Sequence, residues 1–157
     1  MAKIAIIFAF GAPKNLPVNQ VIAKSAESDS SKIDYVFTQE DIPLDSSDKV
    51  IILEGGRYLS TLALLQGVRQ FCVKGHVSIE KIFVLAVRPH LWRVFHDAKK
   101  VFGHAVIPLR LRTEISPYHK DSSQWWTRGP IRWWARELPL RLLRLVSWKR
   151  YKKLSLH

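Results

Sequence analysis

Short apolar runs, the longer of them unbroken, alternate along this chain with longer segments in which apolar residues recur at helical spacing. The runs are four to seven residues long, and they are Ile4–Phe10, Ile33–Phe37, Val50–Leu53, Ile82–Val87 and Ala105–Leu109. Continuous rather than alternating apolar character is typical of strands buried on both faces, as in a parallel sheet. The pattern therefore predicts about five strands.

Helical spacing appears between several of these runs. Two segments each place four apolar residues on one face: Tyr58–Val73 with Leu62, Leu65, Val68 and Cys72, and Pro89–Phe102 with Leu91, Phe95, Ala98 and Phe102. Val18–Ser25 predicts a shorter helix after the first strand. Strands that alternate with helices form a parallel sheet with right-handed crossovers. We therefore expect an α/β protein with a three-layer Rossmann-like fold and a mostly parallel sheet.

Polar stretches and composition suggest how the chain is organised. We expect an α/β core domain over residues 1–121 and a Trp/Arg-rich helical segment over residues 122–157, which packs on the core or extends from it. The single Cys72 excludes an internal disulfide and a multi-cysteine zinc site. Its apolar helical surroundings predict a buried structural thiol.

The net charge of +12 is placed unevenly. Residues 1–60 sum to −2, residues 61–121 to +6 and residues 122–157 to +8. A basic end of this kind predicts an anionic partner, whether a phosphate ligand, a nucleic acid or lipid headgroups. With no charged-then-apolar leader and no apolar span of ~20 residues, we expect a soluble cytoplasmic protein, either free or peripheral to the inner membrane.

Five of the six tryptophans lie in this basic C-terminal segment. Pro130 and Pro139 are each expected near the start of a helix, so the pattern predicts a short helix and a longer one. One interpretation is a helix that closes the sheet, with Trp133 and Trp134 in the core. A second is an interfacial helix on an anionic membrane surface. Nucleic-acid binding by stacked tryptophans is a third and less favoured interpretation, because no known nucleic-acid-binding motif accompanies it.

Three turns that follow strands carry unusual residues. The first contains Gly11, the second runs from Glu54 through Gly55 and Gly56 to Ser60 and Thr61, and the third holds Arg88, His90 and Arg93. The carboxyl ends of parallel strands meet at one edge of the sheet, where ligands of open α/β sheets bind. Glycines allow close backbone approach there, and helix N-termini attract anions. We therefore expect these residues to line one pocket.

Each of these residues also has a purely structural interpretation. Gly55-Gly56 is consistent with a tight turn, and Ser60 and Thr61 with a helix cap. Glu54 can pair with Arg57 on the surface, and Asp97 can hold Arg93 in a salt bridge one helical turn away. His90, just after a helix-starting proline, can be solvated. Their shared position at strand ends is the argument for a site.

Other chemistries have less support. The GxGxxG, GxxxxGK[ST] and GxSxG fingerprints are absent, which argues against standard dinucleotide, P-loop and serine-hydrolase sites. The histidines are too scattered to predict a metal centre, although Glu54 with His90 could hold a cation weakly. No cofactor is indicated.

The order of these motifs resembles the YdcF/SanA/ElyC-like family of bacterial proteins over roughly residues 4–150. The resemblance rests on Glu54 followed by Ser60-Thr61 at a helix start, on a later strand followed by His90 and Arg93, and on a Trp-rich end with Arg136-Glu137. The chain departs from the family where Gly11-Ala12 replaces a Gly-Gly pair and where an Asn on the helix after Thr61 is absent. The resemblance implies a Rossmann-like fold and an association with envelope or lipid-carrier biology.

The functional expectation is a small protein that binds a phosphorylated or nucleotide-like anion at the carboxyl edge of its sheet. Gly11, Gly55, Gly56, Ser60, Thr61, Arg88 and Arg93 are the expected ligand-binding residues. Glu54 and His90 are the acid/base candidates if the protein is an enzyme. The alternative is a non-catalytic membrane-surface or protein-interaction module that acts through the basic Trp-rich C-terminus.

Overall fold

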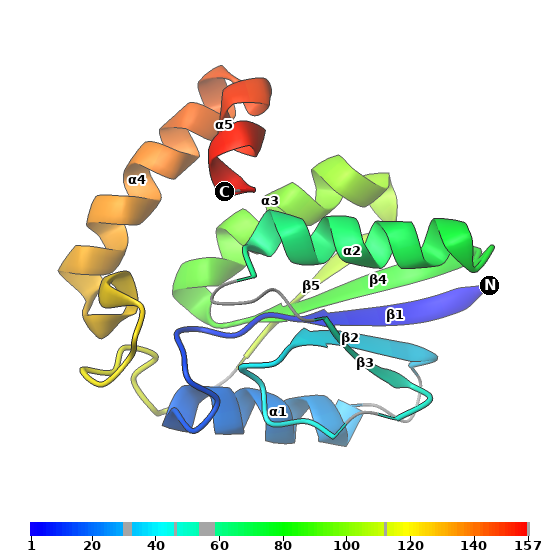
Figure 1. Ribbon diagram of the computed structural model, residues 1–157, viewed down its shortest axis with the longest axis horizontal. Helices are drawn as coiled ribbons and strands as arrows, with labels where there is room; N and C mark the ends of the chain where they lie inside the picture. The colour runs from blue at the N-terminus through cyan, green and yellow to red at the C-terminus, as the bar shows by residue number, and fades with distance from the viewer. Residues whose placement is uncertain (30–32, 46, 54–58, 112, 157) are drawn as a thin grey trace.

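The computed structural model describes residues 1–29, 33–45, 47–53, 59–111 and 113–156. Within them, strands and helices alternate along the first two thirds of the chain, except that the third strand follows the second with no described helix between them, and two more α-helices follow (Figure 1). The strands are β1 (Ala2–Ile7), β2 (Tyr35–Gln39), β3 (Val50–Leu53), β4 (Ile79–Ala86) and β5 (Val106–Arg110). The α-helices are α1 (Pro17–Asp29), α2 (Thr61–Lys74), α3 (Arg88–Phe102), α4 (Pro130–Val146) and α5 (Trp148–Ser155).

All five described strands are parallel and lie in the order β3-β2-β1-β4-β5. This confirms the α/β class, the parallel sheet and the number of strands expected from the apolar runs. The chain moves outward from β1 through β2 to β3, and then crosses back to place β4 on the other side of β1. The boundary between β1 and β4 is therefore the topological switch point, where open α/β sheets bind their ligands.

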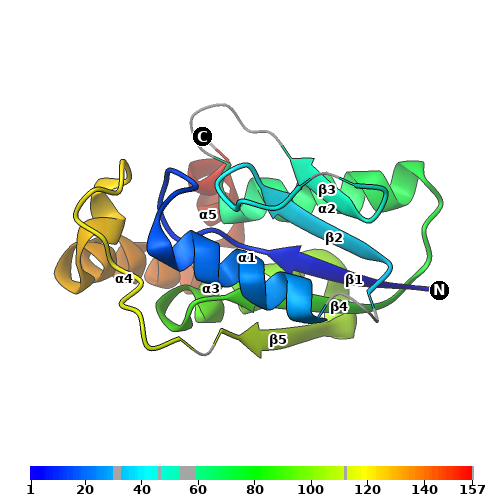
Figure 2. The ribbon, with the colours of Figure 1, turned by 90° about the horizontal axis from the view of Figure 1, so that it is seen from below.

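Both faces of the sheet carry buried apolar side chains, which explains why the strands are continuously apolar. Ile4 and Ile6 of β1 belong to the core under α2 and α3, whereas Ile7 belongs to the core under α1. The same division holds for β4, where Ile82 and Val84 pack on one face and Leu85 on the other. Figure 2 shows α1 covering one face of the sheet, with α2 and α3 behind it. Cys72 is buried in the α2 side of the core, as expected.

The C-terminal segment leaves the sheet edge and returns across the carboxyl ends of the strands (Figures 1 and 2). Trp133 of α4 and Tyr151 of α5 are fully buried, and Trp133 packs on Phe10 with ring centroids 4.6 Å apart. Trp134 points the other way and is 39% exposed. The segment therefore contributes one of its two adjacent tryptophans to the core.

The expected helix boundary at Pro139 is wrong. α4 continues through Pro139 to Val146, and the break comes at Ser147, whose hydroxyl accepts a hydrogen bond from the Arg150 amide and caps α5. Pro139 deprives the Ala135 carbonyl of its helical donor. Both residues are exposed, so water can satisfy that carbonyl. No helix in the described part of the chain is long and apolar enough to cross a membrane.

Replacing Trp133 by Ala should destabilise the protein by about 3–5 kcal/mol, because it removes a fully buried indole between the core and α4. Trp134→Ala is the matched control and should cost under about 1.5 kcal/mol. Urea unfolding of the full chain measures both losses. An unchanged midpoint for Trp133→Ala would show instead that the C-terminal segment is an appendage.

Candidate functional site

The chain after β1 is held in place at the switch point by two buried side chains. Asn19 of α1 accepts a hydrogen bond from the Phe10 amide (3.1 Å) and donates one to the Gly11 carbonyl (3.0 Å). Gln39, at the end of β2, accepts from the Ala9 amide (3.1 Å) and donates to the Leu59 carbonyl (2.6 Å). Two side-chain amides therefore fix the turn after β1 and the chain that leads to α2.

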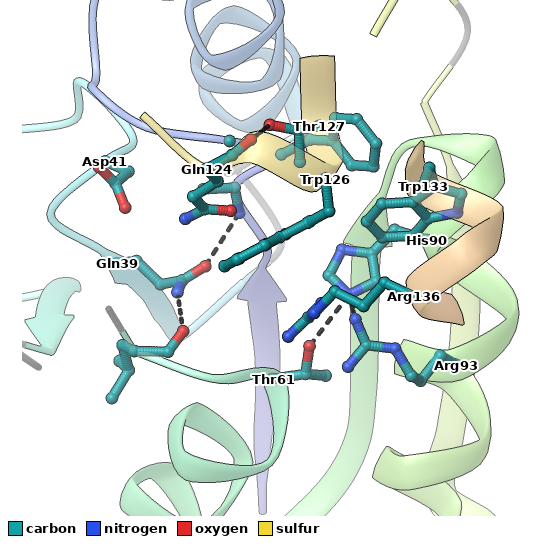
Figure 3. Close-up of a pocket in the computed structure, with 14 residues that line it drawn as sticks. Gln39, Asp41, Thr61, His90, Arg93, Gln124, Trp126, Thr127, Trp133 and Arg136 are labelled. Atoms are coloured by element: carbon teal, nitrogen blue, oxygen red, sulfur yellow. Dashed lines mark hydrogen bonds between the residues drawn. The ribbon is translucent and has the colours of Figure 1, made fainter. Parts of the chain in front are cut away.

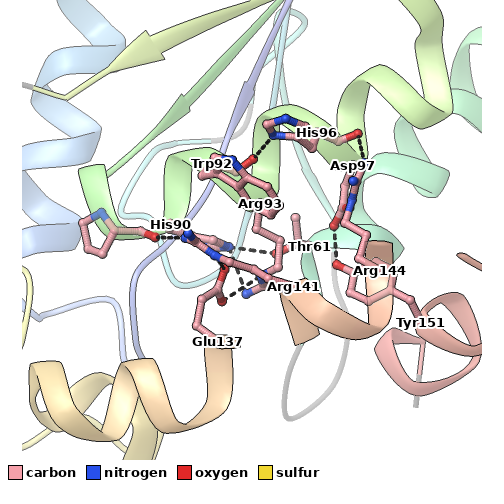
Figure 4. Close-up of polar contacts among 11 residues, drawn as sticks. Thr61, His90, Trp92, Arg93, His96, Asp97, Glu137, Arg141, Arg144 and Tyr151 are labelled. Carbon is pink, nitrogen blue, oxygen red and sulfur yellow. Dashed lines mark hydrogen bonds and ion pairs between the residues drawn. The ribbon is translucent and has the colours of Figure 1, made fainter. Parts of the chain in front are cut away.

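His90 and Thr61 meet at this crevice because each lies in the first turn of a helix that follows a strand. Ser60 caps α2 by accepting a hydrogen bond from the Ala63 amide, which places Thr61 as the first helical residue. In α3, Pro89 occupies the first turn and His90 follows it. The Thr61 hydroxyl lies 2.9 Å from Nε2 of His90 (Figure 4).

The neighbouring Arg93 determines which nitrogen of His90 carries the proton. Nη2 of Arg93 lies 3.3 Å from Nε2 of His90. A guanidinium only donates, so Nε2 is the acceptor and the ring proton resides on Nδ1. Nδ1 is buried and has no hydrogen-bond partner among the described residues. Burial, followed by the charges of Arg93, Arg136 and Arg141, lowers the pKa of His90 well below its usual value, so the ring is neutral at pH 7.

Glu137 of α4 ties this site to the C-terminal segment. Its two carboxylate oxygens accept hydrogen bonds from Nε of Arg93 (3.0 Å) and from Nε of Arg141 (3.0 Å). Arg141 also donates to the Pro89 carbonyl at 3.3 Å. Glu137 is fully buried and is the only acidic residue in residues 122–157. One carboxylate therefore bridges α3 to α4.

A second ion pair lies one turn further along α3. Asp97 accepts a hydrogen bond from Nε of Arg144 (2.8 Å) and another from the Tyr151 hydroxyl. Burial raises the pKa of Asp97, although these two hydrogen bonds oppose that effect, and it also raises the pKa of Tyr151. The expected salt bridge between Asp97 and Arg93 is therefore wrong. Each of these α3 residues pairs with the C-terminal segment instead (Figure 4).

The cavity around His90 is nearly closed. It has a volume of about 10 Å³, and its lining includes Gly11, Thr61, His90 and Arg93 together with four residues of the C-terminal segment, Trp126, Thr127, Trp133 and Arg136. Figure 3 labels all of these except Gly11. That volume is near the least that a single water molecule needs. A phosphate group does not fit in this arrangement, because the C-terminal segment fills the crevice.

Gly11 allows the C-terminal segment to approach the turn after β1 closely. Its φ of +88° favours glycine, and a Cβ there would lie 2.7 Å from Oγ of Ser122 and 2.9 Å from Oγ1 of Thr127. The Ser122 hydroxyl donates to the Ala12 carbonyl next to it. The close approach predicted at this glycine is thus made by residues 122–127 of the same chain.

An open cleft lies beside the closed cavity, between the start of α3, the end of β5 and α4. It has a volume of about 950 Å³, and its walls include three arginines and three aromatic residues: Arg88, Arg110, Arg141, Trp92, Tyr118 and Trp134. The guanidinium of Arg141 sits over the rings of Trp92 (4.5 Å) and Trp134 (4.8 Å). The size suits a small-molecule ligand.

The structure thus divides the residues expected at one pocket. Gly11, Thr61, His90 and Arg93 line the closed cavity, and Ser60 caps α2 at its margin. Arg88 lines the open cleft. Glu54, Gly55 and Gly56 lie outside the described residues.

Residues 89–91 at the start of α3 offer an anion no free amide, contrary to the general expectation for a helix N-terminus. Pro89 has no N–H, and the amides of His90 and Leu91 both donate to the Val87 carbonyl. The arginines of the cleft are therefore better placed to bind an anion than the backbone amides at the start of α3.

Sequence reasoning missed Glu137, Arg141 and Arg110 as parts of these sites. Glu137 carried a usable signal, since a lone acid among nine bases in residues 122–157 is expected to have a cationic partner. No cluster of three or more metal-binding side chains occurs in the described part of the chain.

Lowering the pH below about 6.5, the ordinary His value, should destabilise the folded protein. The unfolded chain takes up a proton at His90 in this range and the folded chain does not, so stability is lost as pH falls, by at most about 1.4 kcal/mol per pH unit from this group. Urea unfolding between pH 7.5 and about 5.5 measures the slope. His90→Gln should flatten it, and an equal slope in that variant would assign the effect elsewhere.

Glu137→Gln should destabilise the protein by about 3–5 kcal/mol, because it removes the charge of a buried carboxylate that pairs with both Arg93 and Arg141. Glu114→Gln, at an exposed carboxylate, is the matched control and should change stability by under about 0.5 kcal/mol. Thermal unfolding of both variants provides the comparison. Equal midpoints would contradict a central role for the carboxylate.

The candidate site therefore comprises a closed polar centre at the switch point and an open, arginine-lined cleft beside it. Comparison of the chain with protein-family models, with curated proteins and with solved structures finds no match.

Proposed function

We propose that this protein binds a phosphorylated or nucleotide-like small-molecule anion in the open cleft at the carboxyl edge of its sheet. The observation that carries the proposal is the convergence of three guanidinium groups from three different elements on one cleft of about 950 Å³. Arg88 begins α3, Arg110 ends β5 and Arg141 comes from α4.

The charges in the cleft favour an anion. Arg88 and Arg110 are exposed, and neither forms an ion pair with a described residue. Among the described lining residues, Glu114 is the one carboxylate that opposes the three arginines. Guanidinium groups form paired, charge-assisted hydrogen bonds with phosphate oxygens. The cleft therefore has the groups that recognise a phosphoryl group.

The aromatic walls favour a ligand with a flat ring. The guanidinium of Arg141 lies over the rings of Trp92 and Trp134, and Tyr118 is a third aromatic residue of the lining. A rigid aromatic surface next to arginines suits a nucleobase, which stacks on its ring face. A nucleoside monophosphate thus fits the combination of charge and apolar surface better than phosphate alone.

The proposal concerns binding rather than catalysis. In this arrangement His90 is neutral, is hydrogen-bonded to Thr61 and Arg93 and borders a cavity for one water. It supports the start of α3, from which Arg88 and the Pro89 carbonyl reach the cleft. A role for Glu54 as acid or base stays a prediction from the sequence.

Calorimetric titration of the full chain with adenosine monophosphate, adenosine and ribose 5-phosphate tests the proposal. The monophosphate should bind more tightly than adenosine because of the arginines, and more tightly than ribose 5-phosphate because of the tryptophans. Arg88→Ala and Arg110→Ala should each weaken its binding about 10- to 100-fold, the loss of one charge-assisted hydrogen bond. Arg69→Ala, on an exposed position of α2 away from the cleft, is the matched control.

Two results would contradict the proposal. One is equal affinity for adenosine and its monophosphate, which would leave the arginines without a role. The other is an Arg88→Ala variant that binds as tightly as Arg69→Ala.

A further inference from the structure

Helix α4 has a second face that the fold does not use. Its inward face carries Trp133 and Glu137, which are 2% and 0% exposed. Its outward face carries Ile131, Leu138, Leu142, Leu145 and Val146, which are between 52% and 85% exposed. In Figures 1 and 2, α4 lies at the edge of the molecule and no drawn element lies beyond it. The helix therefore exposes an apolar face opposite the one that packs on the core.

The exposed apolar residues form one stripe along the helix. At about 100° per residue, Ile131, Leu138, Leu142 and Leu145 fall within an arc of about 60°. Trp134 and Val146 widen the arc to about 120°. This stripe, residues 131, 134, 138, 142, 145 and 146, runs nearly the whole length of α4. A continuous stripe of exposed large apolar side chains marks an interaction surface.

The exposed charges of the C-terminal segment that carries the stripe have a single sign. Residues 122–157 contain nine basic residues and one acidic residue, and the acid is Glu137, buried between two arginines. Arg132, beside the stripe, is exposed. α5 exposes four more cations: Lys149, Arg150, Lys152 and Lys153. No acidic side chain of this segment reaches the surface.

We propose that the stripe is a docking surface for an anionic lipid bilayer, on which α4 lies parallel to the membrane plane. Large apolar side chains flanked by cations are the pattern of helices that bind at the headgroup boundary. Each cation near an anionic surface adds to the attraction, and the apolar side chains supply the part that salt does not screen. A protein partner would need a matching acidic rim, whereas a bilayer supplies anionic charge along the entire helix.

Flotation of the full chain with vesicles tests this surface. Vesicles of phosphatidylcholine are compared with vesicles of equal parts phosphatidylcholine and phosphatidylglycerol. Binding should require the anionic lipid and should weaken, without vanishing, as salt is raised. The Leu138→Ser/Leu142→Ser variant should bind at least about tenfold more weakly, since two exposed leucines lose their apolar contact. Val73→Ser, at a 67% exposed position of α2, is the matched control and should bind as the unchanged chain does.

Thermal unfolding first verifies that both variants are folded. Three results would then overturn the proposal: equal binding to neutral and anionic vesicles, binding to neither, and a double variant that binds like Val73→Ser. Stripe-dependent dimerisation without vesicle binding would assign the stripe to a second copy of the chain. Tighter binding to a single-stranded oligonucleotide, unchanged in the double variant, would assign the basic segment to nucleic acid. None of these outcomes depends on the ligand cleft.

Discussion

The carboxylate of Glu137 lies between the guanidinium groups of Arg93 and Arg141, and the arrangement of the whole carboxyl edge depends on it. Its two oxygens pair with Arg93 of α3 and Arg141 of α4, and the glutamate side chain itself is only 1% exposed. With it, α4 is drawn across the ends of the strands, Trp133 enters the core beside Phe10, and Arg141 reaches the Pro89 carbonyl. A buried ion pair of this kind adds less to net stability than to the choice of one arrangement over others, because desolvation offsets much of its attraction.

This arrangement separates two environments that a Rossmann-like crevice normally combines. The switch point between β1 and β4 is filled by Trp126, Trp133 and Arg136, which reduce it to the size of one water and keep His90 neutral. Space and solvent-accessible positive charge lie beside it, between α3, β5 and α4. Arg141 belongs to both environments, because it pairs with Glu137 on one side and covers Trp92 and Trp134 on the other. The C-terminal segment is thus part of the site as well as of the core.

The two faces of α4 express different physical requirements. The inward face combines a large indole with a carboxylate whose hydrogen bonds are satisfied, as burial requires. The outward face has apolar side chains with no core to enter and cations on its flank. A helix that only closed the fold would have a polar outer face. The apolar outer face is the reason to assign α4 a second contact.

The amino-acid sequence was sufficient to predict the parallel α/β fold. Unbroken apolar runs require burial on both faces, and helical spacing between them requires crossovers, so local periodicity was sufficient. It also determined that one of the two adjacent tryptophans had to be buried, because neighbouring helical positions point about 100° apart.

The ion-pair partners of the buried charges on α3 become known from the tertiary structure alone. Arg93 pairs with a residue 44 positions away and Asp97 with one 47 positions away, and no local period encodes such separations. Local patterns suggested an Asp97–Arg93 pair and a helix start at Pro139, and the structure has neither. Long-range ion pairs determined the partner of Arg93, and exposure to solvent let α4 continue through the proline. The C-terminal segment also separates two residues that are close in sequence. His90 lines the closed cavity, whereas Arg88, two residues earlier, lines the open cleft.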